Sequence, residues 1–136
     1  MKPVTTATID LAALRHNLAR VRAAAPGCRV AAALKANAYG HGMLRAARAL
    51  EAADVFAVAR CDEAMALREA GIGKLILVLE GFLQPEEIEL CRRHGLQATI
   101  HHESQLRMLE LAPRDPPIEV WLKIDTGICL LYTSDA

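Results

Sequence analysis

Residues 55–59 read Val-Phe-Ala-Val-Ala, and residues 74–79 read Lys-Leu-Ile-Leu-Val-Leu. Both runs have the length and the aliphatic character of buried β-strands. Between them, residues 62–70 have helical spacing and are followed by Gly71, the residue type that most often ends a helix. Two strands that run in the same direction need a crossover of this kind, so the stretch predicts a parallel β-α-β unit.

The same alternation continues on both sides of this unit. An additional strand at residues 8–10 leads into a helix that ends at Pro26-Gly27. The other predicted strands span residues 29–34, 97–100 and 118–124, and the other predicted helices span residues 43–50, 85–94 and 103–111. The pattern predicts an α/β fold whose mostly parallel sheet is covered by helices. Periodicity leaves both a doubly wound sheet and a (β/α) barrel open.

Composition narrows the function classes. The chain has 136 residues, and its 16 Lys and Arg residues balance its 16 Asp and Glu residues. A neutral chain without charge runs argues against nucleic acid or an anionic membrane as a partner, and no apolar run approaches the roughly 20 residues of a membrane helix. Four scattered cysteines and five scattered histidines lack metal-ligand spacing, so we expect no metal site. The first residues lack the pattern of a secretory signal, which favours the cytoplasm.

The first candidate for chemistry is Lys35. In the strand that precedes it, Ala31 and Ala33 lie on the same face as Lys35, which stands at the carboxyl end, where ligands bind in parallel α/β folds. The turn at residues 36–42 contains two glycines and leads to a helix start, whose free N–H groups suit a phosphate or carboxylate. The alternative is that Lys35 is a solvated lysine in an ordinary turn.

The last predicted strand also carries charged residues at its carboxyl end. Residues 118, 120, 122 and 124 are all aliphatic, while Lys123 and Asp125 belong to the opposite face. If helices cover the aliphatic face, Lys123 and Asp125 point into the interior; the alternative is a simple ion pair at a wet strand end. The segment Glu80-Gly81-Phe82 is a weaker candidate for lining a site. Asp62 and Glu63 suit the first turn of a helix, which explains them without any chemistry.

Residues 34–42, Leu-Lys-Ala-Asn-Ala-Tyr-Gly-His-Gly, resemble the pyridoxal phosphate attachment motif of the alanine racemase family. Further segments resemble that family in the same order, and together they cover residues 5–127. They are Arg15-His16-Asn17-Leu18, Phe56-Ala57-Val58-Ala59-Arg60 with Glu63-Ala64, Leu79-Glu80-Gly81, and Trp121-Leu122-Lys123-Ile124-Asp125-Thr126-Gly127.

The resemblance implies a (β/α)8 TIM barrel with pyridoxal 5'-phosphate at its C-terminal mouth. It implies that Lys35 forms the internal Schiff base and then acts as base and acid on one face of the substrate α-carbon, and that Tyr39 contacts the cofactor phosphate. Lys123 would be the lysine that is often carbamylated to hold an active-site arginine. The implied activity is the interconversion of L- and D-alanine, which supplies D-alanine for peptidoglycan, in a homodimeric enzyme.

The chain departs from the family pattern after Gly127, where Leu130 stands in the place of an expected arginine. We therefore expect residues 1–127 to be the N-terminal portion of the barrel, cut after about five strands. Residues 128–136 would be a non-matching tail, and the C-terminal β-domain would be absent, which would leave this chain inactive alone. The alternatives are another fold-type III protein, such as a pyridoxal phosphate homeostasis protein, another amino-acid racemase or a decarboxylase, and a catalytically inactive fragment. The Asn37-Ala38-Tyr39-Gly40-His41-Gly42 continuation favours alanine racemase.

Overall fold

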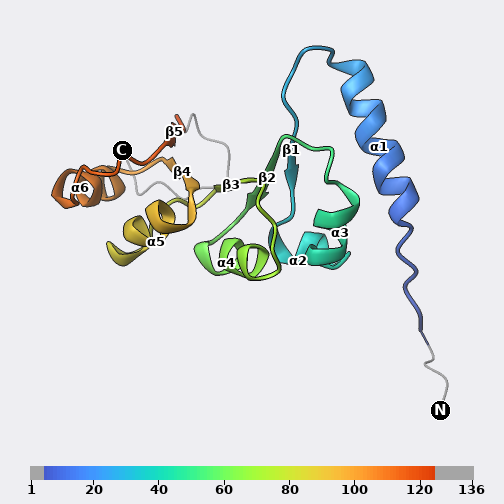
Figure 1. The fold of residues 1–136 in the computed structure, drawn as a ribbon, viewed down its shortest axis with the longest axis horizontal. Coiled ribbons are helices and arrows are strands. Elements are labelled where there is room, and N and C mark those ends of the chain that lie inside the picture. The colour runs from blue at the N-terminus through green and yellow to red at the C-terminus, as the bar shows by residue number, and fades with distance from the viewer. Residues whose placement is uncertain (1–4, 125–136) are drawn as a thin grey trace.

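The computed structural model describes residues 5–124, and it contains one sheet of five parallel strands with helices between them (Figure 1). The strands are β1 (Ala31–Ala33), β2 (Val55–Val58), β3 (Leu75–Val78), β4 (Leu96–Ile100) and β5 (Val120–Leu122). The helices are α1 (Leu11–Ala24), α2 (Lys35–Tyr39), α3 (Met43–Ala49), α4 (Cys61–Glu69), α5 (Glu86–His94) and α6 (Glu103–Leu111). The predicted α/β class and the five predicted parallel strands are confirmed.

Strand order decides between the two architectures that periodicity left open. The sheet runs β1-β2-β3-β4-β5, so each strand pairs with the next one along the chain. A doubly wound sheet has a switch point at which the order reverses, whereas a (β/α) barrel keeps its strands in sequence. These five strands contain no switch point, and their order is that of a partial barrel.

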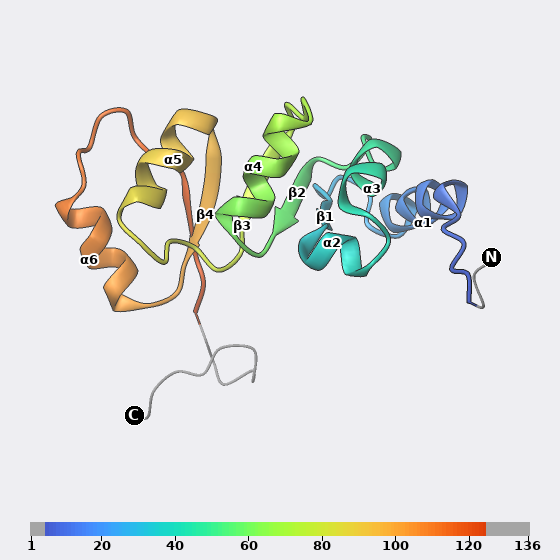
Figure 2. The same ribbon diagram turned by 90° about the horizontal axis from the view of Figure 1, so that it is seen from below.

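The two faces of the sheet are filled differently. On the outer face, α4 and α5 pack beside each other against β2, β3 and β4 (Figures 1 and 2). The strand residues of this face belong to the main core cluster: Phe56, Val58, Ile76, Val78, Ala98 and Ile100. The opposite, inner face is carried by the alternate residues, which pair across the sheet as Ala33↔Ala57, Leu77↔Gln97 and Thr99↔Trp121.

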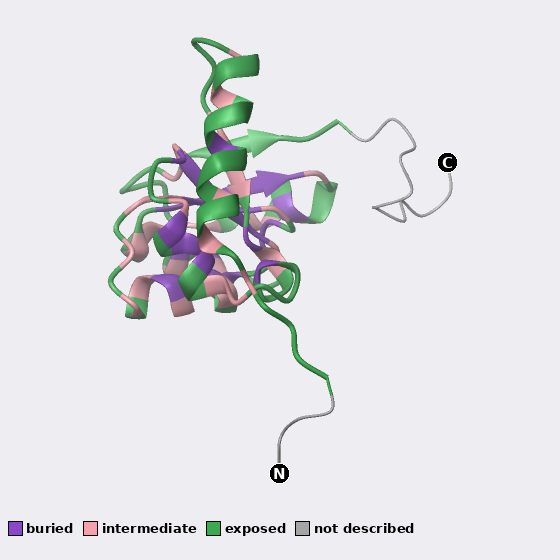
Figure 3. Cartoon of the chain, turned by 90° about the vertical axis from the view of Figure 1, so that its right-hand side faces the viewer, coloured by how far each residue is buried: buried purple, intermediate pink, exposed green. Residues whose placement is uncertain are grey.

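The last strand, β5, is exposed along its length (Figure 3). The condition for an inward-pointing charged face, that helices cover the aliphatic face, is met only in part: Ile118 packs against the main core cluster, whereas Val120 is 43% exposed and Leu122 is 77% exposed. The predicted alternation holds within β5, where Trp121 pairs with Thr99 on the inner face. Asp125, and with it the predicted pairing to Lys123, lies outside the described residues, as do residues 128–136.

The N-terminal prediction is wrong in one respect, because residues 8–10 do not form a strand. Asp10 instead caps α1: its side-chain carboxylate accepts hydrogen bonds from the backbone N–H of Ala12 at 2.8 Å and of Ala13 at 3.1 Å. Asp is among the best residues at this position, since its carboxylate satisfies N–H groups that the helix leaves unpaired. None of the helices within residues 5–124 is long and apolar enough to cross a membrane.

Candidate functional site

Lys35 lies directly after β1, at the carboxyl end of the sheet. Leu34 still belongs to the sheet ladder, since its N–H donates to the carbonyl of Ala57 at 2.7 Å, and its side chain is buried in the outer core. Strand alternation predicts the same face for Lys35 as for Ala31 and Ala33, the inner face of the sheet, but Leu34 has a ψ of 3° and Lys35 already begins α2, so the strand ends at this point. Ala31 and Ala33 precede it on that face, and both are exposed. Their small side chains leave open space in front of the lysine.

The turn that follows Lys35 is left-handed. Ala36, Asn37, Ala38 and Tyr39 have φ values of 52°, 56°, 53° and 53°. L-amino acids pay about 1–2 kcal/mol each for this conformation, and a run of four such residues is unusual. The sequence predicted a turn with two glycines at residues 36–42, and within it residues 35–39 form the short, left-handed α2. Backbone strain of this kind persists only where the surroundings hold it in place, and it concentrates at functional sites.

Several hydrogen bonds hold this left-handed turn. Ala38 N–H donates to the carbonyl of Leu34 at 2.7 Å, and Gly42 N–H donates to the carbonyl of Asn37 at 2.9 Å. The Asn37 side chain accepts from the N–H of Met43 at 2.8 Å, which ties the turn to the first residue of α3. Ala38 is buried, whereas Tyr39 is 61% exposed and leaves its ring accessible.

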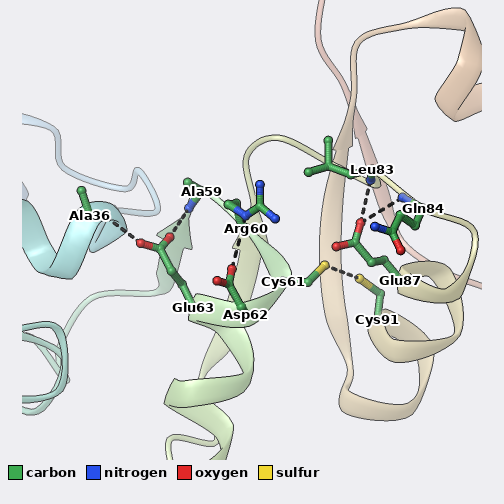
Figure 4. Close-up of polar contacts among 10 residues, drawn as sticks. All are labelled: Ala36, Ala59, Arg60, Cys61, Asp62, Glu63, Leu83, Gln84, Glu87 and Cys91. Atoms are coloured by element: carbon green, nitrogen blue, oxygen red, sulfur yellow. Dashed lines mark hydrogen bonds and ion pairs between the residues drawn. The ribbon is translucent and has the colours of Figure 1, made fainter.

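Glu63 joins the lysine turn to the neighbouring strand (Figure 4). Its Oε1 accepts from the backbone N–H of Ala36 at 2.7 Å, and its Oε2 accepts from the backbone N–H of Ala59 at 2.8 Å. From the sequence, Glu63 was explained by the helix dipole, and these contacts were not predicted. A partial signal was present, because an acid at the third position of a helix often reaches back to the residues before it. Nothing local indicated the bond to Ala36.

The loop after β3 is fixed by Gln105 of α6. The side-chain amide of Gln105 donates to the carbonyl of Glu80 at 2.7 Å, and its oxygen accepts from the N–H of His101 at 2.9 Å. Of the predicted segment Glu80-Gly81-Phe82, Phe82 is 1% exposed and belongs to the core cluster. Phe82 therefore does not line the mouth of the sheet, and the exposed Glu80 is the member that remains accessible.

Lys123 lies at the same end of the sheet as Lys35, but at its opposite edge. Its N–H donates to the carbonyl of Ile100 at 2.8 Å, which continues the β4–β5 ladder. The side chain of Lys123 is exposed, and the neighbouring Trp121 donates from Nε1 to Oε1 of Gln97 at 2.7 Å. Four strand spacings of about 4.8 Å separate β1 from β5 along the sheet. The described residues therefore do not bring the two lysines together.

A family model described as "Alanine racemase, N-terminal domain" matches residues 9–129. An alanine racemase of Shewanella piezotolerans is 46% identical over 136 residues, which are 100% of this chain and 38% of that protein. The biosynthetic alanine racemase of Escherichia coli is 47% identical over 123 residues, which are 90% of this chain and 34% of that protein. The chain thus spans little more than a third of the length of these relatives.

The solved structures that resemble this chain are also alanine racemases. The biosynthetic alanine racemase of Pseudomonas aeruginosa superposes with a TM-score of 0.84 at 39% identity, over 89% of this chain and 34% of that one. The alanine racemase of Acinetobacter baumannii superposes with a TM-score of 0.82 at 33% identity, over 90% of this chain and 35% of that one. The match extends over nearly all of the described sheet and helices, and this chain belongs to the alanine racemase family, within whose N-terminal domain it falls.

Proposed function

We propose that this chain is the part of an alanine racemase that attaches pyridoxal 5'-phosphate through Lys35. The observation that carries the proposal is the position of Lys35, at the carboxyl end of β1, between an alanine-lined strand and a strained left-handed turn. A parallel barrel places its ligands at this end of its strands. Lysine is the side chain that condenses with the aldehyde of pyridoxal phosphate.

The residues around Lys35 fit this cofactor. The exposed Ala31 and Ala33 leave room on the inner face for a flat aromatic ring next to the lysine. Tyr39 follows four residues later with an accessible hydroxyl group, which can donate a hydrogen bond to a phosphate oxygen. Among residues 5–124, no group of three or more potential metal ligands lies together. The groups available at this site are therefore the amine of Lys35, which suits the aldehyde of the cofactor, and the phenol of Tyr39, which suits its phosphate.

The cofactor supplies an electron sink that stabilises negative charge on the substrate α-carbon. Lys35 takes the α-proton from one face of the substrate in one direction of the reaction and gives a proton to that same face in the reverse direction, and a second acid–base group exchanges the proton on the opposite face. Its rigid attachment to β1 and the turn fixes the side from which its amine reaches the α-carbon, and positioning of this kind lowers the barrier to proton transfer. Tyr39 orients the phosphate end.

Lys123 is proposed to be carbamylated in the assembled enzyme. Carbamylation replaces an ammonium with a carboxylate, and that anion can hold an arginine through paired hydrogen bonds. The exposed amine of Lys123 at the carboxyl end of β5 is open to this reaction. The arginine partner, the homodimer, the cytoplasmic location and the supply of D-alanine to peptidoglycan belong to the same proposal. They are supported by family membership and by the relatives named biosynthetic.

Racemisation in the longer protein that contains this segment tests the proposal. With L-alanine and pyridoxal phosphate, the protein should form D-alanine, and Lys35→Ala should abolish the reaction while leaving the thermal unfolding temperature nearly unchanged. Full activity in Lys35→Ala would overturn the proposal. Turnover of another amino acid in preference to alanine would instead favour a different fold-type III racemase or a decarboxylase.

A further inference from the structure

Glu63 is the only described side chain that bonds both to the backbone beside Lys35 and to the end of the next strand. It lies in the first turn of α4, and its two oxygens point in different directions, one to Ala36 and one to Ala59 (Figure 4). Each oxygen accepts one backbone N–H, at 2.7 Å and 2.8 Å. Charge-assisted bonds of this kind are roughly twice as strong as neutral ones.

The hydrogen bond to Ala36 acts on the residue that directly follows Lys35. Ala36 is the first of the four residues with positive φ, and its N–H belongs to the peptide group that joins it to Lys35. Fixing that peptide plane restricts ψ of Lys35, the torsion that sets how the Cα–Cβ bond of the lysine lies relative to the turn that follows it. The second hydrogen bond, to Ala59, anchors the carboxylate to the end of β2. It therefore fixes the position of the turn after Lys35 relative to the sheet.

We propose that Glu63 is a positioning residue: it holds Ala36 in the left-handed conformation and thereby directs the amine of Lys35 toward pyridoxal phosphate on the inner face. This inference rests on the proposed attachment at Lys35. Glu63 touches neither the cofactor nor the substrate in this account. It acts through the backbone, and the carboxylate suits this role because each of its two oxygens accepts from one of the two N–H groups, which lie on opposite sides of it.

The neighbouring Asp62 provides a matched control. Both acids lie in the first turn of α4 and carry the same charge, but the side chain of Asp62 is 76% exposed and pairs only with Arg60, at 3.5 Å. Glu63→Gln and Asp62→Asn each remove one negative charge from the same helix end. Only Glu63→Gln removes an acceptor from the Ala36 and Ala59 pair, because its amide nitrogen is a donor.

The test is borohydride trapping of pyridoxal phosphate on this chain, followed by mass spectrometry of the lysine peptides. Glu63→Gln should slow adduct formation at Lys35 by about tenfold, the effect of losing one charge-assisted hydrogen bond, while Asp62→Asn should stay within about twofold of the unsubstituted chain. Equal trapping rates in the two variants would overturn the inference. Absence of the Lys35 adduct in the unsubstituted chain would instead overturn the proposed function.

A second variant separates positioning from general destabilisation. Glycine adopts positive φ without the penalty that alanine pays, so Ala36→Gly lowers the demand on Glu63. The double variant Glu63→Gln, Ala36→Gly should recover most of the lost trapping rate at Lys35, and thermal melts should show that both variants remain folded. A double variant that is folded but traps as slowly as Glu63→Gln would contradict a role through the Ala36 conformation.

Discussion

Gly81 packs so closely against the backbone of Thr99 that a Cβ atom added at Gly81 would lie 2.0 Å from the Thr99 carbonyl oxygen. The same atom would lie 2.6 Å from Nε2 of Gln105, and Gly81 has a φ of +71°. Only glycine meets both conditions, since it has no Cβ and adopts positive φ freely. The contact fixes the loop after β3 against β4, next to the candidate site.

Gly81→Ala should therefore lower the free energy of unfolding by about 3 kcal/mol or more, the combined cost of a strained φ and of overpacking against backbone. Gly71→Ala is the control, because Gly71 has a φ of +80° but no atom within 4 Å of an added Cβ. That variant should lose only about 1 kcal/mol. Urea unfolding measures both, and equal losses would show that the Thr99 contact does not restrict this position.

Arg68 organises the amino ends of β3 and β4. Its guanidinium donates to the carbonyls of Ile72 at 2.6 Å, Lys74 at 2.8 Å, His94 at 3.0 Å and Gly95 at 3.3 Å. Burial lowers the pKa of Arg68 from its usual range, although the side chain stays charged. We therefore expect substitution of Arg68 to lower the free energy of unfolding strongly, because four carbonyls would lose their hydrogen-bond donor together.

Arg68→Met should lower the free energy of unfolding by about 2–4 kcal/mol, because hydrogen bonds to charged groups contribute about 1.5–3 kcal/mol each and water replaces part of the loss. Arg60→Met is the comparison, since the Arg60 side chain is 53% exposed and pairs only with the exposed Asp62. It should change stability by less than about 0.5 kcal/mol. Chemical denaturation curves measure both values, and a small loss in Arg68→Met would contradict the network.

Asp54 links α1 to the start of the sheet and predicts a pH effect. Its Oδ2 accepts from the N–H of Val30 at 2.7 Å and from the guanidinium of Arg22 at 2.9 Å. The Val30 hydrogen bond, with further help from Arg22, lowers the pKa of Asp54 below its usual value. A lowered folded-state pKa means that the stabilisation is present above the unfolded pKa, near 4, and is lost as the pH falls through the folded value.

Asp54→Asn should accordingly destabilise the chain at pH 7, and its difference from the unsubstituted chain should shrink as the pH falls below about 4. Thermal melts at pH 7 and pH 3 measure this difference, and Asp62→Asn serves as an exposed control. A difference that stays constant between the two pH values would contradict the assigned role of the Asp54 carboxylate.

The cysteines of the described chain should differ in reactivity. Cys28 is exposed, whereas Cys61 and Cys91 are 3% and 0% exposed and lie with their Sγ atoms 3.9 Å apart. The hydrogen bond with Cys61, together with burial, raises the pKa of Cys91 and suppresses its thiolate. Under native conditions at pH 8, iodoacetamide should modify Cys28 at least about a hundredfold faster than Cys91. Peptide mapping measures the rates, and equal rates would mean that this part of the core opens readily.

The sequence predicted the strands well because each is a short aliphatic run bounded by turn residues. It placed Lys35 correctly at the carboxyl end of β1 for the same reason, since the end of a short aliphatic run is a local property. Asp10 was wrongly assigned to a strand because a short β-branched stretch before a helix resembles one. The Asp10 side chain in fact caps the first turn of α1. The pattern left open whether helices cover the aliphatic face of β5, because covering that face requires other parts of a fold, which a periodic pattern does not specify.

Local sequence patterns could not predict the contacts that hold the turn after Lys35. Four consecutive non-glycine residues in the left-handed region contradict every intrinsic preference, so no propensity rule predicts the turn after Lys35. The bond between Glu63 and Ala36 joins residues 27 positions apart, and it exists only because β1 and β2 are neighbours. Such contacts follow from the assembled sheet. The family resemblance pointed to Lys35, and the structure shows the contacts that hold the turn after it.

The most direct test of the account is the identity of the lysine that carries pyridoxal phosphate. The chain has four lysines, Lys2, Lys35, Lys74 and Lys123, so three internal controls are present in one experiment. After incubation with substoichiometric cofactor, borohydride reduction and proteolysis, the account predicts the adduct on the peptide that contains Lys35, and its loss in Lys35→Ala. An adduct distributed evenly over the four lysines, or concentrated on Lys74 or Lys123, would contradict it.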